Sequence, residues 1–536
     1  MRVEGKIVDV LEREIFSGSI DIEDGRIVNI SRHATPAEEY IIPGFIDAHL
    51  HIESSLLTPE NFGALVVKHG TIGVVADPHE IANVVGRAGV DFMIESSRRT
   101  PLRSHFMIPS SVPATPFDVT GGTLSAADVE QMASSGLFVG LAEVMNVQGV
   151  VMGDGELMQK IAAAKAQDLA IDGHAPMASG EALRAYAACG ITTDHECTTL
   201  EEAEEKIALG MKILIREGSA VKNYAALSPL IASNPDMVMF CTDDSHPDDI
   251  ISDGHIDKIV RRAVADGYDL FDTLKIASLN PINHYRLDCG GLEIGSRADF
   301  IVVEDLESFA LKQSYIGGEC VYGGVSSYCA GGDSLVAINN FNHEPITLQE
   351  LSRAVSGEIP IIGLIPDEIV TKAESYIPSE PVENLESDVA ADIAKLVYIN
   401  RYKNTPPVVE YCRGFSLKRG AVASSISHDS HNIVAVGCSD QDLMLAINAI
   451  IESQGGLAVA DRARVDLLPL PIAGIMSGEQ GEVVAEKYGT LQRRVRELGS
   501  DLSSPFMTLS FLSLVVIPEL KIGERGLFSL SKFDWI

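Results

Sequence analysis

Long apolar runs and basic residues are both scarce in this 536-residue sequence, and each scarcity excludes a class of protein. No run of about 18 apolar residues is present, so we expect no membrane-spanning helix. Only 41 Lys and Arg stand against 76 Asp and Glu, which gives a formal net charge of −35. Because nucleic acids and anionic membrane surfaces repel an acidic protein, we expect neither as a partner.

Paired cysteines are also lacking. The eight cysteines are scattered and form no Cys-x-x-Cys pair, so we interpret them as reduced thiols of a cytoplasmic protein. The first thirty residues alternate apolar and polar side chains and carry charges throughout, which is typical of strands and not of a signal peptide. With 46% hydrophobic and 22% charged residues, the chain has the composition of a globular protein with a large core.

The middle of the chain, residues 43–285, alternates short apolar runs with helical stretches. This pattern predicts parallel strands joined by helices. The runs are GFIDAHLHI, GTIGVVADPHE, SHFMIPSSVPA, GLFVGLAEVMN, LAIDGHAP, GITTDHECT, KILIREGSA and MVMFCTDDSHP. Eight such units in about 240 residues predict an α/β fold, a (β/α)8 TIM-like barrel.

The two flanks of this segment have a different texture. Residues 1–42 contain short strand-like runs, and short strands return over residues 286–340, so we expect the two segments to form one small β-sandwich domain. Residues 341–536 are interpreted as a separate C-terminal α/β domain that includes the helix-like stretch QDLMLAINAIIES. Within that domain, the apolar stretch from Phe511 to Ile517 predicts a core strand.

Polar residues gather where the apolar runs of the predicted barrel end. In a (β/α)8 barrel the active site lies at the C-terminal ends of the strands, so residues far apart in sequence converge there. His49 and His51 end the first run, and side chains two residues apart on a strand point the same way. The polar residues that end later runs are Glu143, His174, His195 and the pair Asp243 and Asp244.

Four imidazoles and two carboxylates are the ligand count for two divalent metals that share a carboxylate. His49 and His51 would hold one metal, the other two histidines the second, and Glu143 would bridge them. Any one of these residues alone is more often a polar group satisfied by hydrogen bonds. Their occurrence together at matching strand ends favours the metal centre.

The same residues resemble a known family. PGFIDAHLHIE, together with the polar residues of the fifth, sixth and eighth runs, is similar to the pattern of the amidohydrolase superfamily. Within it, VVADPHEIANVVG, GLAEVMN and CTDDSHP, and the C-terminal stretch ISHDSHNIVAVGCSDQDLMLAINAIIESQGGLAV, resemble the adenine deaminases of bacteria and archaea. The resemblance extends from about residue 40 to the end of the sequence.

This resemblance implies the hydrolytic deamination of adenine to hypoxanthine and ammonia in purine salvage. It implies two Mn²⁺ or Fe²⁺ ions, although such a donor set also accepts Zn²⁺, and we expect a homo-oligomer, a dimer. Related dihydroorotases and hydantoinases carry a carbamylated Lys on the fourth strand, where this chain has Glu143. Two alternatives stay open: a dinuclear amidohydrolase acting on a cyclic amide or another purine, and a non-catalytic binding protein on the same barrel.

In the mechanism that we expect, a hydroxide bridging the metals attacks C6 of adenine. Asp243 takes the hydroxide proton and passes it to the departing amino group; it is preferred over Asp244 because the first Asp after this strand usually has this role in the superfamily. N1 of the ring must gain a proton, and Glu53 and Glu196 are the candidates. Either could instead orient a histidine.

Several other polar residues are candidates for binding the substrate. His79 and Glu80, in the stretch ADPHE, end the second run, and they could bind substrate or an additional ion, or cap the following helix. Asp244 and His246 follow the eighth strand and could contact the purine.

A second polar stretch, ISHDSHN, lies far along the chain in the predicted C-terminal domain. It contains His428, Asp429 and His431. We interpret it as a solvated turn before a strand, with a metal or active-site role as the alternative.

Overall fold

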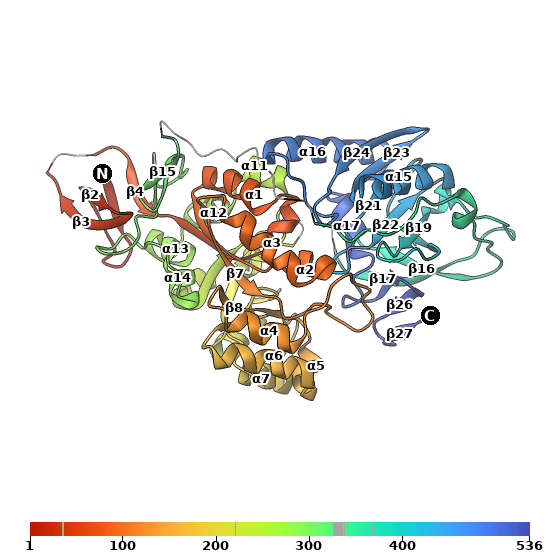
Figure 1. The fold of residues 1–536 in the computed structure, drawn as a ribbon, viewed down its shortest axis with the longest axis horizontal. Helices are drawn as coiled ribbons and strands as arrows, with labels where there is room; N and C mark the ends of the chain where they lie inside the picture. The colour runs from red at the N-terminus through yellow and green to blue at the C-terminus, as the bar shows by residue number, and fades with distance from the viewer. Residues whose placement is uncertain (35–36, 220, 325–335, 337, 367) are drawn as a thin grey trace.

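A computed structural model describes residues 1–34, 37–219, 221–324, 336, 338–366 and 368–536. Figure 1 shows three parts along the long axis of the molecule: a small β-rich part beside the N-terminus, a central part, and a larger part that ends at the C-terminus. Residues 325–335 and 337 of the segment predicted as 286–340 lie outside the described residues. The domain limits given above stay a prediction.

The central part contains all eight predicted strands. They are β5 (Phe45–Leu50), β6 (Thr71–Ala76), β7 (Arg103–Ile108), β8 (Phe138–Val144), β9 (Ala170–Gly173), β10 (Thr193–Asp194), β11 (Lys212–Arg216) and β12 (Val238–Cys241). Strands β5 to β9 form one parallel sheet, and β10 to β12 form a second. Every residue of β5, β6 and β12 is buried, as expected for parallel strands that are covered on both faces.

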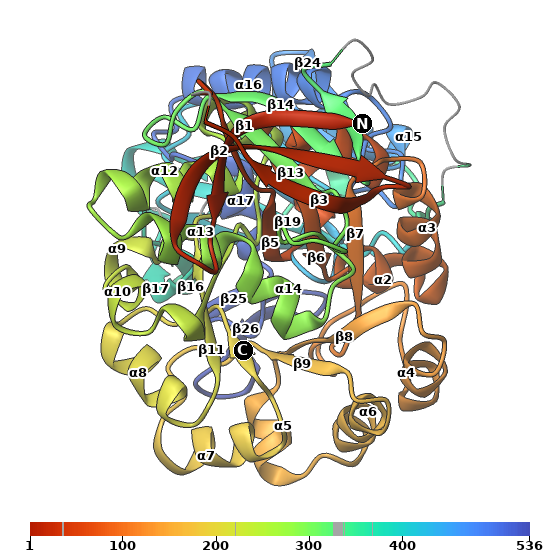
Figure 2. The ribbon, with the colours of Figure 1, turned by 90° about the vertical axis from the view of Figure 1, so that its left-hand side faces the viewer.

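Backbone hydrogen bonds close the two sheets into a ring. On one side, the Asp243 N–H donates to the His49 carbonyl at 3.0 Å, which joins the end of β12 to β5. On the other side, the Thr192 N–H donates to the Ile171 carbonyl at 2.8 Å, which joins β10 to β9. Figure 2 shows helices surrounding these strands. The predicted (β/α)8 barrel is therefore confirmed.

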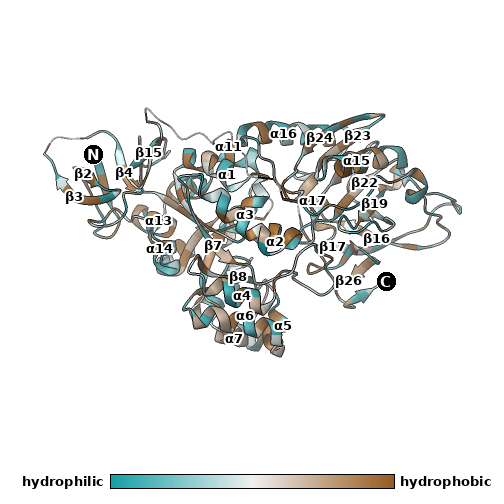
Figure 3. Cartoon of the chain, viewed as in Figure 1, coloured by the Kyte–Doolittle hydropathy of each residue, from teal (hydrophilic) through white to brown (hydrophobic). Residues whose placement is uncertain are grey.

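Helices cover the outside of the barrel. They include α1 (Pro59–Val66), α2 (His79–Val85), α3 (Arg87–Ser97), α4 (Ala126–Ala133), α6 (Gly155–Ala166), α7 (Gly180–Ala188), α8 (Leu200–Ala208), α12 (Ile256–Ala265), α13 (Leu270–Ala277) and α14 (Leu279–Tyr285). In Figure 3 the helices α4, α6 and α7 mix hydrophobic and hydrophilic residues along their length, because each buries only one face. Among the described residues, no helix combines the length and the apolar character of a membrane span.

Both flanks of the barrel contribute to one seven-stranded sheet, ordered β15-β14-β13-β4-β1-β2-β3. The first flank supplies β1 (Arg2–Asp9), β2 (Glu14–Glu23), β3 (Arg26–Arg32) and β4 (Tyr40–Pro43); the second supplies β13 (Phe300–Val303), β14 (Leu311–Ile316) and β15 (Glu319–Tyr322). Strand β4 lies between them, parallel to β1 and antiparallel to β13. The expected small β domain formed by both flanks is confirmed as one seven-stranded sheet, and its description as a β-sandwich stays a prediction.

The C-terminal part is built on a nine-stranded sheet. Its strands are β16 (Ile359–Leu364), β17 (Thr371–Tyr376), β18 (Ser387–Asp388), β19 (Ile393–Ile399), β20 (Val408–Arg413), β21 (Ala421–Ser424), β22 (Ile433–Gly437), β23 (Gly456–Asp461) and β24 (Arg464–Pro469). The predicted helix is α15 (Asp440–Ser453), whose first turn is capped by the Ser439 side chain. The buried side of α15, which includes Leu443, Ile447 and Ile450, packs in a core cluster with residues of the sheet.

The predicted core strand from Phe511 to Ile517 is wrong. The helix α17 (Pro505–Phe511) ends at the first of these residues, and the rest of the stretch forms turns before β25 (Leu520–Gly523). An apolar run of this length fits a buried helix end as well as a strand, so its composition alone does not decide between them. The C-terminal part contains a second long helix, α16 (Gly481–Glu497).

Lys521 in β25 gives a first prediction. Its buried ammonium donates to the carbonyls of Ile369 and Phe511 at 2.7 and 3.0 Å, and burial lowers its pKa to about 7. Above pH 7 the unfolded chain keeps a proton that the folded chain has lost, so the free energy of unfolding should rise with pH, by up to about 1.4 kcal/mol per pH unit between pH 7 and 10. Lys521→Met should remove this rise.

The measurement is urea unfolding of the wild type and the variant at each pH unit from 7 to 10. Lys532→Met, at an exposed site in the same region, serves as the matched control and should keep the wild-type slope. Equal slopes for the wild type and Lys521→Met would contradict the prediction.

Candidate metal centre

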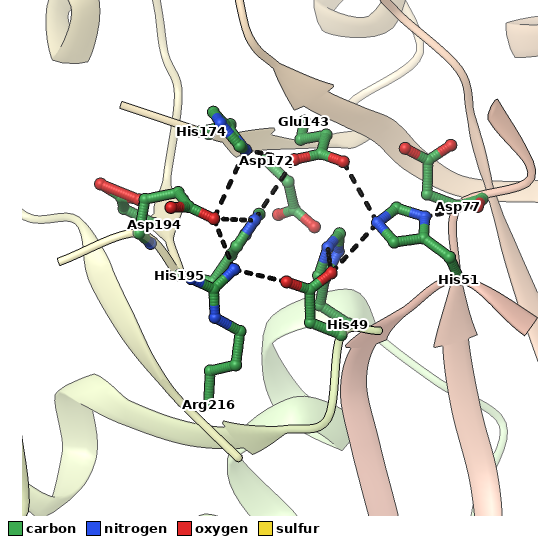
Figure 4. Close-up of polar contacts among 12 residues, drawn as sticks. His49, His51, Asp77, Glu143, Asp172, His174, Asp194, His195 and Arg216 are labelled. Carbon is green, nitrogen blue, oxygen red and sulfur yellow. Dashed lines mark hydrogen bonds and ion pairs between the residues drawn. The ribbon is translucent and has the colours of Figure 1, made fainter. Parts of the chain in front are cut away.

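All six predicted metal ligands lie at the C-terminal ends of barrel strands. His49 is the penultimate residue of β5 and His51 directly follows the strand; Glu143 lies in β8; the remaining three come directly or closely after β9, β10 and β12. Figure 4 shows the imidazoles and carboxylates from these strands pointing toward one another across the mouth of the barrel.

One half of the group combines the first strand with the last. His51 Nε2 lies 3.2 Å from Asp243 Oδ1 and 3.3 Å from Glu143 Oε1. His49 Nε2 lies 3.6 Å from the same Asp243 oxygen. The Nδ1 of His51 is 3.0 Å from the carbonyl of Asp77, a contact that fixes the ring so that Nε2 faces the centre.

The other half is organised by the second oxygen of Glu143. Its Oε2 lies 2.7 Å from His174 Nδ1 and 3.3 Å from His195 Nε2. The two oxygens of one carboxylate therefore face different histidines, as a bridging ligand requires. The rings of His49 and His195 also stack, with centroids 4.2 Å apart, so the two halves are in direct contact.

These residues fit divalent metal ions. Donor atoms of His49, His195 and Asp243 lie within 4.8 Å of one another, and so do those of Glu143, His174 and His195. Ligands about 2.0 Å from an ion are roughly 3.3 Å apart in a tetrahedral site, close to the separations of 3.2–3.6 Å given above. His49 is 1% exposed and its Nε2 has no hydrogen-bond partner among the described residues, which leaves this atom free to ligate.

Arg216, at the end of β11, is a member of the site that the sequence reasoning missed. Arg216 is 4% exposed, and its guanidinium pairs with both Asp243 Oδ2 and Glu196 Oε1. Burial alone would raise the pKa of Asp243. The opposite effect of Arg216 and the neighbouring histidines is larger, so the pKa is held well below its usual range. Its position in the sequence could have indicated that it belongs to the site, because Arg216 lies at the end of the seventh apolar run, just as the proposed ligands lie at the ends of other runs.

The two candidates for the N1 proton donor lie in different surroundings. Burial raises the pKa of Glu196, but Arg216 and the adjacent histidines lower it below its usual value. Glu53 forms no ion pair among the described residues: its Oε1 accepts from the Ile81 N–H at 3.2 Å, and its buried Oε2 has no hydrogen-bond partner among them. Burial raises the pKa of Glu53 to about 7.

The predicted substrate-binding residues are divided between two environments. Glu80, Asp244 and His246 line a small cavity together with Glu53. His79 does not line it; it begins α2, and its Nδ1 lies 2.9 Å from Asp77 Oδ2.

Asp243 and Asp244 have different partners. The strand ends at Cys241, and Asp243 adopts a left-handed backbone conformation with φ 53°. Its carboxylate faces His49, His51 and Arg216, whereas the Asp244 carboxylate accepts a hydrogen bond from Ser54 and lies 3.2 Å from His428 Nε2.

The interpretation of ISHDSHN as a solvated turn is wrong. Asp429 and His431 are 1% and 2% exposed. His431 Nε2 contacts the Glu80 carboxylate, and Asp429 Oδ1 lies 3.4 Å from His79 Nε2. This loop of the C-terminal part covers the mouth of the barrel, a contact between residues about 350 positions apart that local sequence does not reveal.

Two wider cavities open beside the centre, between the barrel and the C-terminal part. The first reaches His174, and the second reaches Glu196 and Arg216. Pro176, Val516, Ile517 and Leu530 line both, so the two cavities are neighbours and their shared wall is apolar.

Comparisons with known proteins agree with this architecture. Residues 40–321 match the amidohydrolase family, the class that the barrel and its ring of histidines and carboxylates define. Residues 368–534 match the adenine deaminase C-terminal domain.

Full-length relatives narrow the class. An adenine deaminase of Sulfurovum sp. (strain NBC37-1) is 48% identical, with 100% of this chain and 99% of the relative covered. Those of Methanosarcina mazei and Parabacteroides distasonis are each 43% identical, with 99% of this chain and 98% of each relative covered. The chain belongs to the adenine deaminase family of amidohydrolases, and the resemblance drawn from its motifs is confirmed.

Proposed function

We propose that this chain hydrolyses adenine to hypoxanthine and ammonia at a centre of two divalent ions. The observation that carries the proposal is the position of Glu143, whose two carboxylate oxygens face different histidines in a chain that matches adenine deaminases over its full length. The proposed ligands are His49, His51, Glu143, His174, His195 and Asp243. Divalent ions bound there would lower the pKa of a water molecule and so supply a nucleophile near neutral pH.

The nature of the ions follows from the donor set. Imidazole nitrogens and carboxylate oxygens suit Mn²⁺, Fe²⁺ and Zn²⁺, and no thiolate is among the proposed ligands. We propose Mn²⁺ or Fe²⁺.

Asp243 is proposed as the base. The paired Arg216 keeps its carboxylate ionised, and an ionised carboxylate at the centre can take a proton from the attacking water. The same carboxyl group then donates that proton to the departing amino group. Arg216 also pairs with Glu196, so it holds both carboxylates at fixed positions beside His195.

Glu53 is proposed as the group that protonates N1 of adenine. Its raised pKa, about 7, leaves a large fraction of the carboxyl groups protonated near neutral pH, and its Oε2 is free to face a ligand in the small cavity. Glu196 is tied to Arg216, and its Oε1 lies 3.8 and 3.4 Å from the nitrogens of His174 and His195 that face Glu143, so it is proposed to stay ionised beside the centre and not to donate the N1 proton.

A glutamine at position 53 tests this role. Glu53→Gln keeps the shape of the side chain but removes the transferable proton, so kcat for adenine should fall by about 10²–10⁴-fold while the metal content stays at the wild-type value. Glu217→Gln changes a buried carboxylate that pairs with Arg262, away from the centre, and should keep the wild-type kcat. Equal kcat values for the wild type and Glu53→Gln would contradict the assignment.

The activity itself is tested by ammonia release from adenine, using protein purified with Mn²⁺ and a metal determination on the same sample. Rapid release from metal-loaded protein supports the proposal. Metal-loaded protein that releases no ammonia from adenine would overturn the substrate, and other purines and cyclic amides would then be assayed. Protein that neither binds metal nor releases ammonia after reconstitution would favour a non-catalytic binding role.

A further inference from the structure

A second group of potential metal ligands lies where the barrel meets the C-terminal part. It consists of His79 and Glu80, from the first turn of α2, and of His428 and Asp429, from the loop that precedes β22. We call these four residues the interdomain cluster. Three of them are buried and His428 is nearly so. None of the four is among the proposed ligands of the dinuclear centre.

Four donor atoms of the interdomain cluster form a closed ring. Asp429 Oδ1 lies 3.4 Å from His79 Nε2 and 3.0 Å from His428 Nδ1. Glu80 Oε1 lies 3.8 Å from His79 Nε2 and 3.4 Å from His428 Nδ1. Three of the four separations exceed the usual length of a hydrogen bond. They instead approach the roughly 3.3 Å that separates the ligands of a tetrahedral ion.

The far sides of both imidazoles are held by carboxylates. His79 Nδ1 lies 2.9 Å from Asp77 Oδ2, and His428 Nε2 lies 3.2 Å from Asp244 Oδ2. Each ring therefore donates away from the cluster and turns its other nitrogen toward Glu80 and Asp429. A histidine that ligates a metal is oriented in this way by a carboxylate or carbonyl on its second nitrogen.

The charges of the cluster also call for a cation. Glu80 and Asp429 bring two buried carboxylates to one place, and Asp77 and Asp244 lie directly behind the imidazoles. Asp429 Oδ2 is buried and has no hydrogen-bond partner among the described residues. Buried carboxylates are stable only when they are paired with positive charge or when they coordinate a metal.

We propose that the interdomain cluster binds a third divalent cation, of the class that accepts mixed imidazole and carboxylate ligands. His79 and Glu80 would supply ligands from the barrel, and His428 and Asp429 would supply ligands from the C-terminal part. The ion would therefore join the two parts beside the small cavity, which Glu80 and His428 both line. The two sets of proposed ligands share no residue, and they meet where His79 Nδ1 lies 3.6 Å from Glu143 Oε1.

The test is metal analysis of the full chain purified with Mn²⁺ and desalted. The wild type should retain about three ions per chain and Asp429→Asn about two, whereas Ser430→Ala, at the next position of the same loop, should match the wild type. A variant with both Glu143→Ala and His195→Ala should keep the ion at the interdomain cluster. Loading with Co²⁺ adds a second readout, since a tetrahedral site gives strong visible absorption that Asp429→Asn should lose.

Crystals of the Mn²⁺-loaded wild type keep the test decisive if Asp429→Asn does not fold. An anomalous peak among His79, Glu80, His428 and Asp429 would support the site directly. Two ions in both the wild type and Asp429→Asn would overturn it and show an ion-pair network in which the histidines carry protons. A loss of adenine affinity in Asp429→Asn at unchanged metal content would also overturn it and assign the cluster to substrate binding. Three ions without ammonia release would support the site and count against the proposed function alone.

Discussion

Replacing His49 by alanine should abolish both metal binding at the dinuclear centre and deaminase activity. The His49 Nε2 is buried, faces Asp243 and has no hydrogen-bond partner among the described residues, so a bound ion is the partner that would satisfy it. Alanine removes this ligand. We expect kcat for adenine to fall by at least about 10³-fold, since several kcal/mol of transition-state stabilisation depend on the metals.

Metal content and ammonia release are measured on the same preparation. His105→Ala is the matched control, because His105 lies in β7 of the same barrel and contacts Cys289 away from the centre. The control should keep the metal and activity of the wild type. If His49→Ala retained the full metal complement together with wild-type kcat, His49 would not be a ligand.

The second large effect is expected at Arg216. In Arg216→Met the carboxylates of Asp243 and Glu196 lose the buried cation that they share. Removal of one partner from a buried ion pair costs about 3–5 kcal/mol of stability. Loss of Arg216 should also raise the pKa of Asp243, so that more of its carboxyl groups are protonated and unable to accept a proton, and we expect kcat to fall by about 10²–10³-fold.

The free energy of unfolding in urea and kcat with adenine measure the two effects separately. Arg262→Met is the control: Arg262 is 45% exposed on its side chain and pairs with Glu217, so its loss should cost less than about 1 kcal/mol and leave kcat unchanged. Arg216→Lys keeps a charge that cannot reach both carboxylates in the same planar geometry, and it should fall between the two. A wild-type kcat in Arg216→Met would show that Asp243 needs no partner.

The barrel could be predicted because its signal is local and repeats. Each strand is a short apolar run that ends in a polar residue, and each is followed by a helical stretch. Eight separate segments therefore predict the same unit, a strand followed by a helix. The small β domain was harder, since β4 and β13 pair across about 260 residues, but the return of short strands after the barrel indicated it. The stretch from Phe511 to Ile517 shows the limit, because an apolar run alone does not choose between helix and strand.

Some residues of the candidate site could likewise be predicted from the sequence, and others could not. The proposed ligands could be found because imidazoles and carboxylates at strand ends carry a chemical signal. Arg216 occupies an equivalent position, but an arginine at a strand end matches no ligand pattern. Asp429 and His431 could not be placed, because their burial results from packing between two parts of the chain. A polar loop has the same local sequence whether water or another domain covers it.

The seven-stranded sheet has a consequence for synthesis of the chain. Strand β4 can pair with β1 as soon as residues 1–43 have left the ribosome, but its other edge must wait for β13, about 260 residues later. At roughly 5–20 residues per second, that delay is on the order of ten to fifty seconds. During this interval the edge of β4, with Ile41 and Ile42, is an unpaired apolar template for association with other chains. Nascent copies translated close together on one messenger RNA therefore run their greatest risk of aggregation while the barrel is being made, and that risk ends when β13 emerges.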